Sequence, residues 1–139
     1  MLAVDELNDD GFVAAFEDLS LDPKSFTHRS HLRLAWWCLR QAPLGEAARR
    51  CAEDIKRFAT HHGQPQKFHL TLTLAFMHIV QERRLAGPPR ERFEEFLSRN
   101  PDLLGNARAV IGRHYSDSAL SDPAARIAFV SPDRAPLFV

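Results

Sequence analysis

The stretch KFHLTLTLAFMHIVQERR, residues 67–84, is the most apolar part of the chain and decides its fold class. Thr71, Thr73 and Val80 are residue types that favour strands, so a β-strand is the alternative. Strands are usually only about five or six residues long, whereas the apolar periodicity continues here over the whole segment. The pattern therefore predicts a long central helix, which the prolines of Gly87-Pro88-Pro89 end.

Outward from this segment, apolar residues recur at helical spacing between capping residues and helix breakers. We expect an all-α, single-domain helical bundle of about five to seven helices over residues 1–139, with an extended C-terminal tail. The other expected helices cover approximately residues 9–20, 27–40, 46–62, 90–98 and 101–114, with a short one after Ser121-Asp122-Pro123.

Composition restricts the class of protein. A chain of 139 residues suits one domain, and 45% hydrophobic with 26% charged residues is ordinary for a soluble globular protein. The 18 basic residues balance the 18 acidic ones, so no global field attracts nucleic acid or an anionic membrane. There is no signal peptide pattern and no apolar run long enough to span a bilayer. We expect a cytoplasmic protein with no nucleic-acid or membrane partner; its oligomeric state is unknown.

The two cysteines, Cys38 and Cys51, fall on apolar helical positions. This placement is typical of two small core residues in a reducing compartment rather than of a disulfide. A cysteine deep on an apolar face is expected to have a raised pKa, so Cys38 is not predicted to be a nucleophile.

Three of the seven histidines lie in the middle of apolar helix faces. The spacing of His28 and His31 places both rings on one side of a helix, and His69 falls on the inward face of the central segment. Burying an unpaired polar group costs about 1–3 kcal/mol, a cost that one shared ion would remove for all three. The pattern predicts an internal site in which His28, His31 and His69 bind zinc, copper or iron. The alternative is three separate core histidines, each with its own hydrogen bond.

Two further residues are candidates for a catalytic acid or base, or for a further metal ligand. Glu17 stands at the margin of the apolar face of its helix, and His114 falls on an inward face. His62 also continues an inward stripe, formed by Ile55 and Phe58, but its place in the last helical turn is explained by the helix dipole.

Other signals are weaker. Arg33 falls on the outer arc of its helix, so we expect a solvated side chain; the alternative is an arginine that binds an anionic group. Four aromatic residues could form the wall of a pocket, although aromatics at helical spacing usually belong to the core: Trp36, Trp37, Phe68 and Phe76.

The runs FTHRSHLRLAW (26–36), KFHLTLT (67–73) and NPDLL (100–104) resemble a family of small uncharacterised bacterial helical proteins. With Phe16-Glu17 and residues 125–130 the likeness covers most of the chain. The resemblance implies no activity, but it implies a site, because the recurrent polar positions of the family match Glu17, His28, His31 and His69.

The sequence thus predicts a small protein with an internal histidine-rich site that binds metal, either simply or as a metal-dependent enzyme acting on a small molecule. A metal-free enzyme with a histidine general base is a second interpretation. The alternative from another class is a non-catalytic small-ligand-binding or protein-interaction module with structural core histidines.

Overall fold

The computed structural model describes residues 7–139, which form nine α-helices, two short 3-10 helices and no β-strand. The all-α prediction is confirmed, and five of the helices have seven or more residues. The strand alternative for the central segment is wrong, since Leu70–Leu85 is a continuous helix. Within residues 7–139 no helix combines the length and apolarity needed to cross a membrane.

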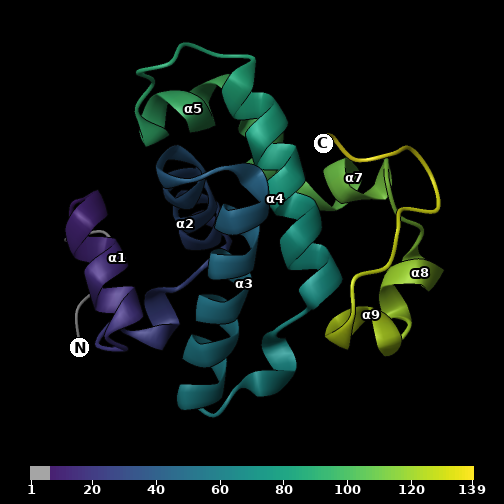
Figure 1. Ribbon diagram of the computed structural model, residues 1–139, viewed down its shortest axis with the longest axis horizontal. Coiled ribbons are helices and arrows are strands. Elements are labelled where there is room, and N and C mark those ends of the chain that lie inside the picture. The colour runs from purple at the N-terminus through teal and green to yellow at the C-terminus, as the bar shows by residue number, and fades with distance from the viewer. Residues whose placement is uncertain (1–6) are drawn as a thin grey trace. The chain divides into compact units, whose positions relative to one another are not determined.

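The chain divides into two compact units, one ending at Phe68 and one covering His69–Val139. The elements of the first unit are α1 (Asp9–Glu17), η2 (Pro23–Ser25), α2 (His28–Gln41), α3 (Leu44–His61) and η3 (Pro65–Lys67). The elements of the second unit are α4 (Leu70–Leu85), α5 (Phe93–Arg99), α6 (Pro101–Gly105), α7 (Ala107–Gly112), α8 (Asp117–Ser121) and α9 (Ala124–Ile127) (Figure 1).

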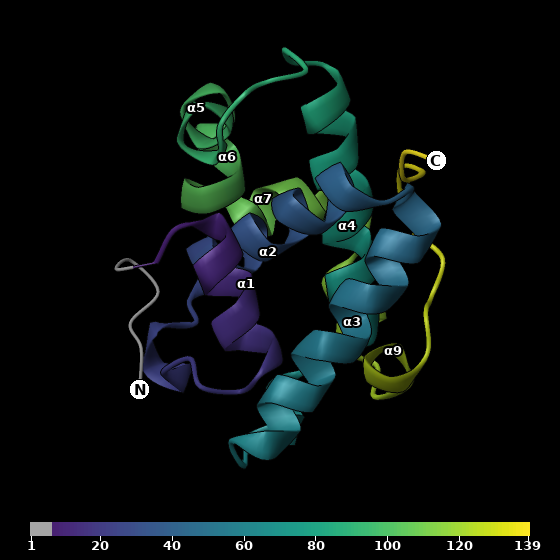
Figure 2. The same cartoon turned by 60° about the vertical axis from the view of Figure 1, so that its left-hand side comes forward.

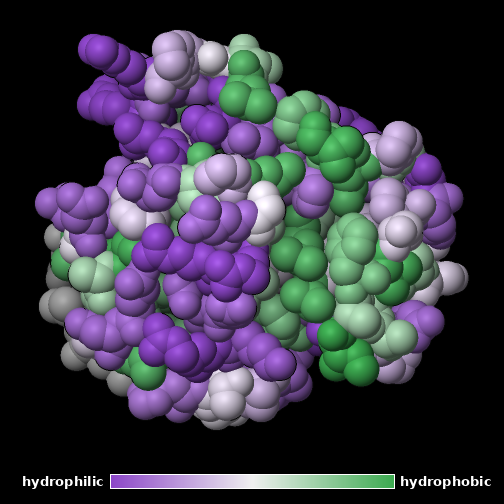
Figure 3. All heavy atoms as spheres, viewed as in Figure 1, coloured by the Kyte–Doolittle hydropathy of each residue, from purple (hydrophilic) through white to green (hydrophobic). Residues whose placement is uncertain are grey.

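The helices α2 and α3 pack against each other and form the main helix pair of the first unit (Figures 1 and 2). Small buried side chains line α3 on its inner side and allow close packing. They are Ala47, Ala48, Cys51 and Ala52. The outer face of α3 is hydrophilic and faces solvent (Figure 3), as its strong amphipathic pattern requires.

Arg33 connects α2 to the start of α1, and the expectation of a solvated arginine is wrong. The residue is only 8% exposed. Its Nε donates to Asp9 at 2.9 Å, and its terminal nitrogen donates to the carbonyl of Leu7 at 2.9 Å. A buried guanidinium is tolerated when it is paired and hydrogen-bonded in this way.

Helix ends in the second unit differ from the prediction at two places. The first difference is at α4, which begins at Leu70 because His69 lies outside the helix as its N-cap. The second is at Asn106, which has a non-helical φ of −142° and separates α6 from α7 within the predicted 101–114 helix. The single helix predicted there is therefore wrong, and α8 had no counterpart in the prediction.

Arg83 of α4 holds the start of α6 by a two-pronged ion pair. Its two terminal nitrogens donate to the two carboxylate oxygens of Asp102 at 2.9 and 2.8 Å, and one also donates to Asn100 at 3.0 Å. Asn100 is 4% exposed and donates in turn to the carbonyl of Phe96 at 3.0 Å. This network fixes the junction of α5 and α6 against α4.

After α9 the chain has no further helix or strand up to Val139, and side chains of α4 and the turn after α7 bind its backbone. The Thr71 hydroxyl, fully buried, donates to the carbonyl of Ala128 at 3.0 Å and accepts from the N–H of Val130 at 3.1 Å. Tyr115, also buried, donates to the carbonyl of Val130 at 2.6 Å. The extended form of this tail stays a prediction.

The Arg83–Asp102 pair predicts a pH dependence of stability. Hydrogen bonds from Arg83 lower the pKa of Asp102 in the folded chain. Because the folded pKa is depressed, the pair stabilises the fold above the unfolded pKa of about 3.9, and its contribution disappears as the pH falls through the folded pKa. We expect the difference in unfolding free energy between wild type and Asp102→Asn to shrink between about pH 6 and pH 3 in urea unfolding experiments. A difference that stays constant over this range would contradict the assignment.

Candidate functional site

The predicted metal ligands fall in both units, His28 and His31 in the first and His69 in the second. His28 is the first residue of α2 and is exposed, so the prediction that its ring lies inside is wrong. The reason is that the apolar face of α2 becomes buried only from Ser30 onward, after the capping turn made with Thr27.

His31 is half-buried and held by the backbone of its own helix. Its Nδ1 lies 2.8 Å from the carbonyl of Thr27 and donates to it, because a carbonyl can only accept. The ring packs on Phe26 with 4.1 Å between the ring centroids. Burial lowers the pKa of His31, against the opposing effect of the Thr27 hydrogen bond, and the charge of His28 adds to the lowering. Burial therefore favours the neutral form of the His31 ring.

Both ring nitrogens of His69 are occupied by backbone groups. Nδ1 accepts from the N–H of Leu72 at 3.1 Å, which caps α4, and Nε2 donates to the carbonyl of Leu120 at 3.0 Å. A neutral imidazole has one donor and one acceptor nitrogen, so this ring has no remaining capacity. A metal bond at His69 would have to replace one of these hydrogen bonds.

No group of three or more His, Cys, Asp or Glu side chains within residues 7–139 is placed to hold a metal ion. Three protein ligands are the usual minimum for a catalytic zinc site. The metal site at His28, His31 and His69, with zinc, copper or iron, therefore gains no support here and stays a prediction.

The two candidate acid or base residues also belong to different units. Glu17 ends α1, its carboxylate accepts a short hydrogen bond from Arg50, and its carbonyl accepts from Arg57 at 2.6 Å. His114 follows α7 and donates through Nδ1 to the carbonyl of Ala135 at 2.9 Å. Each has a structural partner, and their catalytic roles stay predictions.

The cysteines are buried and unbridged, as expected. The thiol of Cys51 on α3 donates to the sulfur of Cys38 on α2, which lowers the pKa of Cys38. The same hydrogen bond and burial raise the pKa of Cys51 well above its ordinary value. This lowering is opposite to the raised pKa expected for Cys38, because helix periodicity does not place the second thiol beside it.

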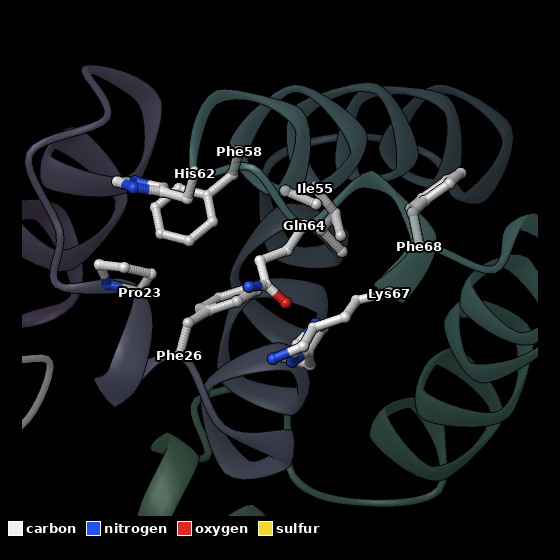
Figure 4. Close-up of a pocket in the computed structure, with 10 residues that line it drawn as sticks. Pro23, Phe26, Ile55, Phe58, His62, Gln64, Lys67 and Phe68 are labelled. Carbon is white, nitrogen blue, oxygen red and sulfur yellow. The ribbon is translucent and has the colours of Figure 1, made fainter.

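A pocket of about 100 Å³ lies in the first unit, between η2, the start of α2, the end of α3 and η3 (Figure 4). Its wall is mainly aromatic, and the rings of Phe26 and Phe58 meet in it with 5.2 Å between their centroids. Phe16 supports both rings from behind, at centroid distances of 4.8 and 4.7 Å. The residues lining the pocket are Pro23, Phe26, His31, Ile55, Phe58, Ala59, His62, Gln64, Lys67 and Phe68.

His62 brings a polar side chain with an unpartnered nitrogen to the lining of this pocket. Its ring packs on Phe58 with 4.5 Å between the centroids, and in Figure 4 it lies beside Phe58 and above Pro23. Its Nε2 is buried and has no hydrogen-bond partner within residues 7–139. Buried polar atoms in native proteins nearly always have partners, so an exception calls for an explanation.

Two further polar side chains come from the segment after α3. Gly63, with a φ of 71°, ends the helix and turns the chain back toward the pocket. Gln64 extends its amide across the middle of the view in Figure 4, toward Phe26 and the amino group of Lys67. The pocket therefore has an aromatic wall and a polar edge.

Sequence reasoning missed most of this site. The inward phase of His62 with Ile55 and Phe58 is a usable signal, but the helix dipole is by itself a sufficient reason for a histidine in the last turn. Of the four aromatic residues predicted as a pocket wall, only Phe68 lines this pocket. Gln64 and Lys67 gave no signal, since they lie in a turn.

Comparison of the chain with protein-family models, curated protein sequences and solved structures finds no match. The resemblance to a bacterial family therefore stays a prediction.

Proposed function

We propose that the first unit is a small-ligand-binding module whose ligand occupies the pocket between α2, α3 and η3. The observation that carries the proposal is the unpartnered Nε2 of His62, a residue that lines this pocket. A buried polar group without a partner costs about 1–3 kcal/mol, and a ligand atom that completes its hydrogen bond recovers that cost. Ligand sites typically combine an apolar lining with a few polar groups that orient the ligand.

Size restricts the ligand. Pockets for drug-sized molecules have volumes of about 300–1,000 Å³. A dry engineered cavity of about 150 Å³ accepts benzene. A pocket of about 100 Å³ therefore suits a molecule of few non-hydrogen atoms.

The proposal predicts opposite effects of His62→Leu on stability and on binding. Leucine removes the unpartnered nitrogen and places an apolar side chain at the same position, so we expect the unfolding free energy to rise by about 1 kcal/mol. Sites kept for function commonly cost stability in this way. Urea unfolding measures the change, and His61→Leu, at the exposed neighbouring residue, is the matched control with an expected change within about 0.5 kcal/mol.

The predicted effect of His62→Leu on ligand binding is tested by amide NMR spectra. They are recorded for the wild type and the variant with a panel of small organic molecules and with zinc. Shifted amides clustered in residues 23–31 and 55–68, and weaker in the variant, support the proposal. Destabilisation by His62→Leu, or a panel in which no molecule shifts these amides, contradicts it. Zinc shifts centred on His28 and His31 would favour the metal site instead.

A further inference from the structure

We infer that the ligand of this pocket is a short organic carboxylate whose apolar body lies against Phe26 and Phe58 and whose carboxylate faces Lys67. This inference rests on the proposed ligand-binding function and specifies the chemical class of the ligand.

The described lining of the pocket contains a basic residue and no acidic one. Lys67 is the one lysine in the lining, and no arginine, aspartate or glutamate belongs to the described lining. Within residues 7–139 the ammonium group of Lys67 has no ion pair or hydrogen bond. An ammonium group has three donors and no acceptor, so it favours an anion and disfavours a cation.

The remaining polar groups suit the same ligand. The amide of Gln64 supplies two N–H donors beside Lys67 (Figure 4). An ionised carboxylate accepts hydrogen bonds only, and can therefore be satisfied by groups that are all donors.

The rest of the lining requires an apolar body. Ile55 and the rings of Phe26, Phe58 and Phe68 offer no polar atom to a ligand. Together with the pocket volume of about 100 Å³, this selects monocarboxylates of about four to six carbons over dicarboxylates, sugars or nucleotides.

The test compares butyrate with butyramide, its neutral isostere, by NMR titration at low ionic strength. We expect butyrate to bind the wild type with a Kd of about 0.1–1 mM, given the ceiling on affinity per ligand atom. Butyramide should bind at least about tenfold more weakly, because it cannot use the charge of Lys67.

The variants are Lys67→Met, which keeps the aliphatic stem, and Lys56→Met as the matched control, since Lys56 is exposed on α3 outside the pocket lining. Lys67→Met should weaken the affinity for butyrate about 5- to 20-fold and leave the affinity for butyramide unchanged. Lys56→Met should change either affinity by less than about twofold.

The outcomes separate the two proposals. The inference that the ligand is a carboxylate is overturned if butyrate and butyramide bind equally, or if Lys67→Met leaves the affinity for butyrate unchanged. In either case the proposed ligand-binding function still stands. If neither these compounds nor any member of the wider panel shifts the amides of the pocket, both proposals fail.

Discussion

Phe58→Ala is expected to lower the free energy of unfolding by about 3–5 kcal/mol. The ring is 4% exposed and contacts Phe16, Phe26 and His62 at centroid distances of 4.7, 5.2 and 4.5 Å. Its removal costs the transfer free energy of the ring and leaves a void that joins the existing pocket, and aromatic pair energies are lost in addition.

Urea unfolding followed by circular dichroism measures this loss. Phe58→Leu is the matched control, because leucine fills most of the same space and should cost about 1–2 kcal/mol. A loss below about 1 kcal/mol in Phe58→Ala would mean that the aromatic cluster is not the core of the first unit. The same variant should also abolish binding of small ligands in the pocket, since Phe58 forms part of its wall.

The second large effect is expected in the other unit, for Arg83→Met. Methionine keeps an apolar stem but removes the guanidinium that holds both carboxylate oxygens of Asp102 and the amide oxygen of Asn100. Asn100 is almost fully buried, so its oxygen loses its partner without gaining full access to water. The ion pair itself is partly exposed, with side-chain exposures of 22% and 30%, so we expect a loss of about 2–3 kcal/mol rather than the larger cost of a fully buried pair.

Two controls belong to this experiment. Arg83→Lys keeps the positive charge but not the two-pronged geometry, and should recover less than half of the loss. Arg108→Met removes an exposed arginine of α7 and should change the unfolding free energy by less than about 0.5 kcal/mol. Equal stability of Arg83→Met and Arg108→Met would contradict the structural role of the ion pair.

Together the two variants test whether the chain is the single domain predicted from its sequence. Phe58 belongs to the first unit and Arg83 to the second. A single cooperative domain requires that each variant raise hydrogen exchange of core amides in both units by the same free energy. An effect limited to the unit that contains the substitution would identify two domains, with the boundary at Phe68 and His69.

The sequence was sufficient for the fold class and for most helices, because periodicity and breakers are local properties of the chain. The strong amphipathic pattern over Leu44–His61 and the prolines around residues 88 and 89 are examples. Asn106 was missed because Gly105 and Asn106 weaken a helix without forbidding it, and the choice to break there depends on packing.

The candidate site was predictable only in part, for a different reason. The inward phase of His62 follows from helix geometry and was visible in the sequence. The roles of Arg33 and His69 were not visible, because each residue binds a partner far along the chain. Arg33 donates to Asp9, and His69 donates to the carbonyl of Leu120. Helical wheels assign a face, but they cannot supply a distant partner.

The distribution of tryptophan gives the first unit an optical signal of its own. Both tryptophans, Trp36 and Trp37, belong to the first unit, whereas the chain's single tyrosine, Tyr115, is buried in the second. Tryptophan emission, excited at wavelengths that tyrosine does not absorb, therefore follows the first unit alone. Without any label, the unfolding of the first unit can be observed in the native chain apart from that of the second.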